Sequence, residues 1–259
     1  MQKNRLKEKL RAGKGCQGMF LNVPSPALVE IAGLLGMDFV IIDAEHGPPD
    51  LETVEHCVRA AESSGISTVS RIAMNIPQNI LRFLDAGSQG VQIPMVNTDE
   101  QARAVADSVK YPPVGKRGLA AVRANGFGIE RPLGEYTRMA NEETLVVVQI
   151  ETVEAIKNAE KICQVDNIDV VFVGPTDLSS SMGYSGQPTH PEVIKAITNL
   201  GKIITKAGKV GGTIARDPEA YKQWRDAGFQ YLATGTSNLF ADATRAYVQG
   251  CRAKDAGRA

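Results

Sequence analysis

A short unit repeats along this chain: a helical segment ends at or near a glycine, and an apolar strand follows at once. Glycine readily adopts the left-handed conformation that ends many helices, so each copy predicts a helix stop followed by a strand. The intervals from Gly36 to Gly65 and from Gly65 to Gly87, 29 and 22 residues, suit one strand–helix unit each. The copies are LLGMDFVIID (34–43), SSGISTVSR (63–71), DAGSQGVQIP (85–94), KAGKVGGTI (206–214) and DAGFQYLATG (226–235).

Eight strands are predicted in all, with helical segments such as 26–35 and 50–64 between them. Strands that alternate with helices predict an α/β fold, and eight of them favour a (β/α)₈ barrel over an open doubly wound sheet. The open sheet remains an alternative, because periodicity alone does not show closure. No domain boundary interrupts the pattern, so we expect a single barrel domain over residues 1–259. The strands are 18–22, 39–43, 67–71, 90–94, 145–151, 170–174, 210–214 and 231–235.

The charge balance limits the partners of the chain. Lys plus Arg and Asp plus Glu both number 29, which argues against nucleic-acid or anionic-membrane binding, since both need a basic excess or patch. No stretch approaches the ~18 apolar residues of a membrane helix, and no signal-peptide core follows the basic start of the chain. The four cysteines form no CxxC pair and are expected to be reduced thiols. We therefore expect a cytoplasmic protein.

Two predicted strands each deliver a carboxylate where they end. VVVQIE (146–151) ends in Glu151, and VVFVGPTDLS (170–179) carries Asp177 just past its strand. Both strands are rich in Val and Ile, which is typical of buried parallel sheet, and the 18 residues between them suffice for a crossover helix. Two carboxylates side by side predict a hard-metal site, because oxygen ligands suit Mg²⁺ or Mn²⁺. The alternative is that Glu151 caps the next helix and Asp177 caps a turn.

Other strand ends bring further polar residues to the same rim. The second strand leads into Asp43, Glu45 and His46, and the third ends at Arg71. A histidine with a carboxylate to orient it is the usual general-base arrangement, although a hydrogen-bonded structural histidine is the alternative. Arg71 is a candidate to hold an oxyanion or enolate oxygen, or else a salt-bridge partner of Asp43 or Glu45.

Further motifs narrow the chemistry. The turn from Gly174 to Asp177 offers free backbone N–H groups that could hold a small carboxylate. None of the predicted strands contains a lysine, which disfavours Schiff-base catalysis. No GxGxxG follows the first strand and there is no P-loop, so no nucleotide cofactor is expected. The Gly-, Pro- and Arg-rich stretch 111–144 breaks the repeat and is expected to be a functional loop.

Six blocks of sequence, taken together and in order, resemble the HpcH/HpaI aldolase family: DFVIIDAEHGP, SRIAMN, GVQIPMV, YPPVGKRG, VVVQIET and VFVGPTDLS. The resemblance runs from about residue 5 to 250. It implies a TIM barrel of the phosphoenolpyruvate/pyruvate type and a class II aldolase that depends on Mg²⁺, Mn²⁺ or Co²⁺. Such an enzyme reversibly cleaves a 4-hydroxy-2-oxo acid to pyruvate and an aldehyde through a metal-stabilised enolate. Oxaloacetate decarboxylation and cleavage of a CoA thioester on the same site are alternatives, and a non-catalytic barrel is a third.

The resemblance also assigns catalytic and metal-binding roles to single residues. Glu151 and Asp177 match the metal-binding carboxylates, and His46 with Asp43 matches the catalytic base dyad. Glu45 matches an outer-shell residue that orients metal-bound water.

Substrate-binding roles follow from the same blocks. Arg71 matches the arginine on the keto or enolate oxygen, Gln149 a polar residue close to the metal, and the backbone of Gly174, Pro175 and Thr176, on to Asp177, the segment that holds the pyruvate carboxylate. Arg117 and Arg123 are candidates for the acceptor end.

The family pattern implies a homo-oligomer, a hexamer or trimer of dimers, in which C-terminal helices are exchanged between subunits. Here residues 238–252 would form that helix. The chain departs from the pattern at Ser237, where many members have Asp, and at Met19, Phe20 and Asn22, where others carry a Trp. These departures concern the acceptor pocket rather than the metal or the base.

Overall fold

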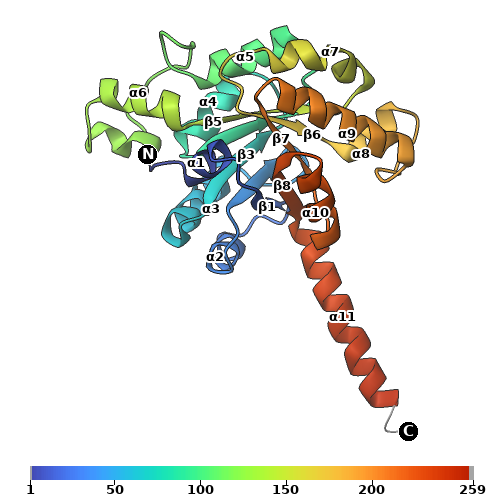
Figure 1. Ribbon diagram of the computed structural model, residues 1–259. Helices are drawn as coiled ribbons and strands as arrows, with labels where there is room; N and C mark the ends of the chain where they lie inside the picture. The colour runs from blue at the N-terminus through green and yellow to red at the C-terminus, as the bar shows by residue number, and fades with distance from the viewer. Residues whose placement is uncertain (1, 257–259) are drawn as a thin grey trace.

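Eight parallel strands form the centre of the computed structural model, which describes residues 2–256 (Figure 1). Each strand pairs with the next, and β1 pairs with β8, so the sheet closes into a barrel. The eight predicted strands and the barrel are confirmed, and the open sheet is excluded. Positions 1 and 257–259 of the expected domain lie outside the described residues. The strands are β1 (Cys16–Leu21), β2 (Phe39–Ala44), β3 (Ser67–Ile72), β4 (Gly90–Ile93), β5 (Leu145–Ile150), β6 (Val170–Val173), β7 (Val210–Ile214) and β8 (Phe229–Gly235).

Helices surround the barrel, and local signals in the sequence start and stop them. Gly65 ends α3 in the left-handed conformation, with φ of 74°, as the repeat predicts. Within residues 2–256, no helix is both long and apolar enough to cross a membrane. The helices are α1 (Arg5–Arg11), α2 (Pro26–Leu34), α3 (Leu51–Ser64), α4 (Pro77–Asp85), α5 (Asp99–Val109), the 3₁₀ helix η1 (Arg123–Gly128), α6 (Leu133–Glu143), α7 (Val153–Cys163), α8 (Pro175–Ser181), α9 (Pro191–Lys206), α10 (Pro218–Asp226) and α11 (Thr236–Ala256).

The core has two layers, one inside the barrel and one between the barrel and the helices. Successive strand residues point to opposite faces, so strands that are apolar on both faces fill both layers. Inside, Phe39 stacks on Tyr231 with ring centroids 4.2 Å apart, and Phe172 meets Tyr231 edge-on. Gly18 leaves room for this cluster, because a Cβ there would lie 2.2 Å from the Phe39 ring.

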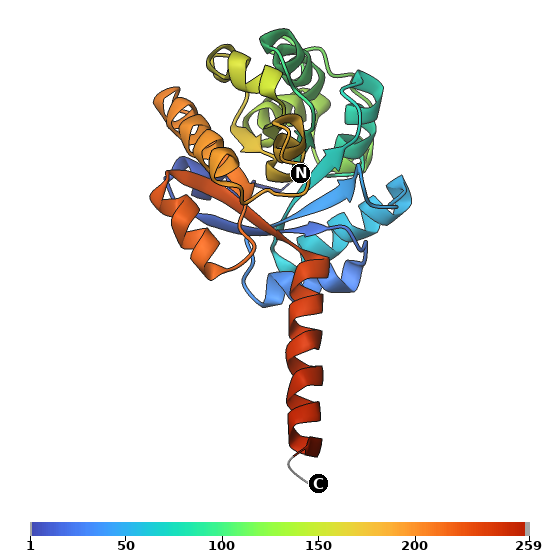
Figure 2. The same ribbon diagram turned by 90° about the vertical axis from the view of Figure 1, so that its right-hand side faces the viewer.

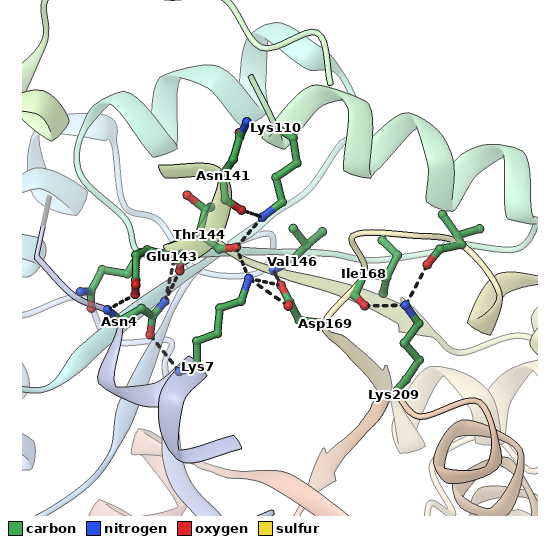
Figure 3. A network of polar contacts seen from close by, with 12 residues as sticks. Asn4, Lys7, Lys110, Asn141, Glu143, Thr144, Val146, Ile168, Asp169 and Lys209 are labelled. Carbon is green, nitrogen blue, oxygen red and sulfur yellow. Dashed lines mark hydrogen bonds and ion pairs between the residues drawn. The ribbon is translucent and has the colours of Figure 1, made fainter. Parts of the chain in front are cut away.

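A buried polar network closes the barrel at the amino-terminal ends of its strands (Figure 3). Lys7 of α1 donates to the carbonyl oxygen of Thr144 at 3.0 Å and pairs with Asp169 at 2.9 Å. Lys110 donates to the same Thr144 carbonyl at 2.9 Å and to the carbonyl of Asn141 at 2.8 Å. Since α1 and this network cover one end, an open site is expected at the other, where the strands carry their carboxyl ends.

The last helix, α11, runs straight out from the barrel wall and away from the rest of the chain (Figures 1 and 2). It begins directly after β8. Several apolar side chains along it are exposed, Phe240 and Tyr247 most of all.

Candidate active site

A cavity of about 470 Å³ opens at the carboxyl end of the barrel. Most of the site residues expected from the sequence line it, and they come from separate strands or from the turns just after them. Its lining consists of Phe20, Asn22, Asp43, His46, Arg71, Gln149, Phe172, Gly174, Pro175, Thr176, Asp177, Ile214, Gly235 and Asn238. The barrel topology thus brings together residues that lie more than 200 positions apart in the sequence.

Asp43 and Arg71 occupy paired positions on β2 and β3. Arg71 donates from Nε to Asp43 Oδ1 at 2.9 Å and from Nη2 to Oδ2 at 2.6 Å. Its Nη1 lies 3.1 Å from Glu45 Oε2. Burial raises the pKa of Asp43, but the hydrogen bonds and charge of Arg71 outweigh it and hold that pKa below its ordinary value. Arg71 is therefore ion-paired and faces the pocket at the same time.

His46 reaches Asp43 through its main chain. Its backbone N–H donates to Asp43 Oδ1 at 3.2 Å, as does that of Glu45. The imidazole is 64% exposed, and its Nε2 lies 4.0 Å from Glu45 Oε2. The acid nearest the ring is therefore Glu45 rather than Asp43, because the forked guanidinium of Arg71 takes both Asp43 oxygens. The dyad expected from the sequence is joined here through the backbone, and the ring is free to turn toward a ligand.

Glu151 is a buried carboxylate held by two donors. Its Oε1 accepts from the backbone N–H of Met95 at 2.7 Å, and its Oε2 accepts from Nε2 of Gln149. Gly174 makes room for it, since a Cβ there would lie 2.5 Å from Oε2. Burial raises the pKa of Glu151 to about 7, against the effect of its two donors. Thr152, and not Glu151, caps α7 with its side chain, so the capping alternative does not explain Glu151.

Asp177 stands in the first turn of α8 and faces the same pocket. Its charge and that of Glu45 add to the raised pKa of Glu151, so the three acids repel one another around one space. Two oxygen-donor side chains with such repulsion fit a divalent cation such as Mg²⁺ or Mn²⁺. Over residues 2–256 no group of three or more His, Cys, Asp or Glu side chains is arranged to hold a metal. A cation between Glu151 and Asp177 would therefore leave positions open for water or substrate oxygens.

The turn before α8 offers backbone donors to the pocket. Pro175 follows Gly174 at the start of the helix, and a proline has no N–H. The first N–H groups of a helix have no partner within it, so those of Thr176 and Asp177 are the ones available.

Arg117 and Arg123 lie away from the pocket. Arg117 is buried, pairs with Asp85 at 2.8 Å and stacks 4.6 Å above the ring of Tyr111. Arg123 pairs with Glu62 and donates to the carbonyl oxygen of Ala86 at 3.2 Å. Neither lines the cavity, because a carboxylate elsewhere holds each guanidinium. The structure of the single chain does not bring these two candidates to the acceptor end.

Sequence reasoning missed some polar residues at the site. Gln92 and Tyr231 lie inside the barrel and connect to Gln149; a glutamine within an otherwise apolar strand was the available signal. Asn238, which was also missed, lines the pocket. Asn22, already noted as a departure from the family pattern, lines it too and donates to Ser237 Oγ at 3.1 Å. Of the positions where the chain departs from the family pattern, Phe20 and Asn22 line the pocket, whereas Met19 packs in the outer layer.

Comparison with known proteins adds independent findings. The family model described as HpcH/HpaI aldolase/citrate lyase matches residues 17–242. A hydroxypyruvate/pyruvate aldolase of Cupriavidus necator is 38% identical over 93% of this chain and 90% of its own length. A 4-hydroxy-2-oxo-heptane-1,7-dioate aldolase of Salmonella typhimurium is 37% identical over 90% of this chain and 88% of its own. The crystal structure of an HpcH/HpaI aldolase/citrate lyase family protein from Burkholderia cenocepacia superposes with a TM-score of 0.91 at 31% identity, covering 96% of this chain and 99% of that one.

Proposed function

The chain belongs to the HpcH/HpaI aldolase/citrate lyase family, and from that premise we propose that it is a divalent-metal-dependent pyruvate aldolase. It is a carbon–carbon lyase. The reaction we propose is the reversible cleavage of a 4-hydroxy-2-oxo acid to pyruvate and an aldehyde. Relatives named as pyruvate and 4-hydroxy-2-oxo-heptane-1,7-dioate aldolases support this substrate class.

One arrangement carries the proposal. Asp177 lines the pocket with the ion-paired guanidinium of Arg71 and the exposed imidazole of His46. The Glu151 carboxylate lies just behind the pocket wall, against Gln149 and Gly174, which do line it. Cleavage of a 4-hydroxy-2-oxo acid needs a place for developing negative charge at the keto oxygen and a base for the 4-hydroxyl proton. The pocket holds a candidate for each.

Glu151 and Asp177 are the residues that would hold the cation. A divalent ion bound there would supply Lewis-acid polarisation of the 2-oxo group. The backbone N–H groups of Thr176 and Asp177 would receive the substrate carboxylate at the start of α8. Asn22 and Asn238 also line the pocket and are candidates to contact the C4 end of the 2-oxo acid.

His46 and Arg71 would then act on the two ends of the breaking bond. His46 accepts the proton of the 4-hydroxyl, the C4–O bond becomes a carbonyl, and the C3–C4 bond breaks. The electron pair of that bond passes into the enolate of pyruvate, whose oxygen Arg71 contacts with its guanidinium. The proton that His46 took up is returned to C3 of the enolate, which completes pyruvate and restores His46, and the aldehyde leaves from the C4 side.

We also propose that α11 packs against another copy of the chain in a homo-oligomer. A helix of 21 residues that stands clear of its own barrel, with Phe240 and Tyr247 exposed, is poorly suited to solvent. Phe240→Asp should shift the sedimentation coefficient toward that of a monomer. A wild-type chain that sediments as a monomer at micromolar concentration would contradict this assembly.

The first test of the function is deuterium exchange into the methyl group of pyruvate in D₂O, followed by proton NMR. This half-reaction requires enolisation alone and needs no knowledge of the aldehyde. We expect exchange with Mg²⁺ or Mn²⁺ and its loss with EDTA. Glu151→Gln and Asp177→Asn should abolish it, whereas His56→Ala, on the outer surface of α3, should leave it unchanged. Absence of exchange with every divalent metal would contradict the proposal.

A further inference from the structure

Four buried polar side chains form a continuous hydrogen-bonded chain across the inside of the barrel. Tyr231 of β8 lies with its hydroxyl 3.4 Å from Gln92 Oε1 on β4. Gln92 Nε2 donates to Gln149 Oε1 at 2.6 Å, and Gln149 Nε2 donates to Glu151 Oε2. Gln92 and Tyr231 are both 0% exposed. This chain therefore runs from the barrel interior to a carboxylate of the candidate active site.

The direction of every hydrogen bond in this chain is fixed from one end. In the ionised state that would hold a cation, the Glu151 carboxylate only accepts, so Gln149 presents its NH₂ group to it. The carbonyl oxygen of Gln149 then faces Gln92, which has to donate, and the carbonyl of Gln92 faces the Tyr231 hydroxyl. Burial raises the pKa of Tyr231 well above its ordinary value, so its hydroxyl keeps the proton it donates.

Burying two amides in an apolar interior costs free energy unless all their hydrogen bonds are satisfied. The barrel interior around them is built of Phe39, Phe172 and aliphatic side chains, and an unpaired polar group there would destabilise the fold. An apolar side chain of equal size would fill the space without that requirement. Here the hydrogen-bonded side chains instead hold in place the amide of Gln149, which is the donor to Glu151.

The Glu151 carboxylate is held from both sides. Gln149 occupies one lone pair of Oε2, and the Met95 N–H occupies one of Oε1. Met95 has a positive φ of 56°, an uncommon conformation for a non-glycine residue, and in it the N–H points at Glu151. Each oxygen keeps a lone pair that neither donor uses, and the charge of Asp177 is close enough to raise the pKa of Glu151.

We propose that Gln92 and Tyr231 are positioning residues, which fix the amide of Gln149 and thereby aim the Glu151 carboxylate at a cation in the pocket. The inference rests on the proposed function. Without Gln92, the carbonyl oxygen of Gln149 loses its donor, so the Gln149 side chain is held only at its Glu151 end and can shift together with the carboxylate. Neither Gln92 nor Tyr231 lines the cavity, so any effect of theirs on the cation must pass through Gln149.

The test is Mn²⁺ binding, measured by the electron paramagnetic resonance signal of free Mn²⁺, with no substrate present. Gln92→Met keeps the side-chain volume and removes the amide. We expect its Mn²⁺ affinity to fall about tenfold, the low end of the effect of losing a direct partner of a metal ligand, because Gln92 acts through Gln149. Tyr231→Phe removes one hydroxyl and should weaken binding only about threefold, in line with a single long hydrogen bond. At saturating Mn²⁺ the exchange rate of Gln92→Met should recover most of its wild-type value.

Thr213→Val is the matched control. It also removes a buried side-chain hydrogen bond of the barrel wall, which Thr213 Oγ1 donates to the carbonyl oxygen of Val173 at 2.9 Å. None of the four hydrogen-bonded side chains from Tyr231 to Glu151 takes part in this bond. It should bind Mn²⁺ as the wild type does. Wild-type affinity in Gln92→Met, or an equal loss in Thr213→Val, would overturn the positioning role. If Gln92→Met does not fold, unchanged affinity in Tyr231→Phe would overturn it. A wild-type protein that binds no Mn²⁺ would instead refute the proposed function.

Discussion

Asp43 and Arg71 meet in a two-point ion pair across neighbouring strands, with both guanidinium contacts at 2.9 Å or less. Both side chains are buried, and they line the pocket together. The planar fork of an arginine matches a carboxylate in a way that a lysine does not. This pair therefore sets the orientation of the one guanidinium that faces the pocket from β3.

Replacement of Arg71 should separate stability from catalysis. Arg71→Ala leaves the Asp43 carboxylate buried without its partner and should cost about 3–5 kcal/mol of unfolding free energy. Arg71→Lys keeps a positive charge near Asp43 and should unfold much closer to the wild type. Neither alanine nor lysine presents the planar guanidinium that faces the pocket, so pyruvate exchange should fall about a hundredfold or more in each variant. Urea unfolding and NMR exchange on the same samples make the comparison. Wild-type exchange in Arg71→Lys would remove Arg71 from the proposed mechanism.

Replacement of His46 should lower the rate of catalysis and leave stability almost unchanged. Its ring is mostly exposed, so His46→Ala should change the unfolding free energy by no more than about 0.5 kcal/mol. Loss of a general base typically costs about 10²- to 10⁴-fold in rate, and we expect a decrease in that range for aldol cleavage. His56→Ala is a suitable control, because His56 is also exposed and also sits near a glutamate, with Nε2 3.8 Å from Glu52. Equal activities of the two variants would rule out His46 as the base.

The sequence predicts best the residues whose position in the fold follows from the local pattern of a strand and its end. A β-branched run that ends in a carboxylate puts Glu151 at the strand end wherever the strand lies, and the parallel register then brings Asp43 beside Arg71. The partners of Arg117 and Arg123 follow no such rule. Asp85 on α4 and Glu62 on α3 lie 32 and 61 residues away from them, and only tertiary packing selects them.

Contacts between side chains inside the barrel could not be predicted from the sequence, for a related reason. Gln92 and Tyr231 are 139 positions apart and on strands that do not pair. Strand periodicity predicts which face a side chain takes, but it does not tell which side chain meets it across a closed barrel. The sequence named Asp43 or Glu45 as an ion-pair partner of Arg71, and the structure pairs Arg71 with both.

Metal binding should depend on pH through Glu151. Its pKa rises from the ordinary 4.5 to about 7 in the folded chain. Because a cation binds the deprotonated carboxylate, Mn²⁺ affinity should increase as pH rises toward about 7 and then level off. In Asp177→Asn binding should be weaker, and the step should move to lower pH, because the charge that repels Glu151 is gone. Titration with Mn²⁺ across this range, followed by electron paramagnetic resonance, provides the measurement.

The same shift affects the stability of the metal-free protein. The folded pKa of Glu151 lies above the unfolded one, so the folded state binds more protons between about 4.5 and 7. The contribution of Glu151 to stability is therefore greatest below this window and is lost as pH rises through it. Glu151→Gln should show a smaller decrease across the window than the wild type. If both proteins have the same pH dependence, then Glu151 does not titrate with a raised pKa.

Lys110, at the closed end of the barrel, predicts a pH effect of the opposite sign. Burial, together with the charge of Lys7, lowers its pKa from 10.5 to about 7. Its ammonium has two carbonyl acceptors, on Asn141 and Thr144, and no direct carboxylate partner among its hydrogen bonds (Figure 3). Between pH 7 and 10.5 the unfolded chain therefore holds one more proton at this position than the folded chain. Stability should rise with pH over that range, by at most about 1.4 kcal/mol per pH unit.

Lys110→Met tests this at the level of one side chain. The wild type and the variant should be compared by urea unfolding at several pH values from neutral to about 9. Titration of the buried cysteines, whose pKa values burial also raises, opposes stability at high pH but is common to both proteins and cancels in the difference. We expect the free energy of unfolding of the wild type to increase relative to that of the variant as pH rises. Only the wild type has a lysine that becomes neutral without leaving its two carbonyl partners. Parallel stability curves would mean that Lys110 stays charged in the folded protein, and that the network around Thr144 accommodates two ammonium groups side by side.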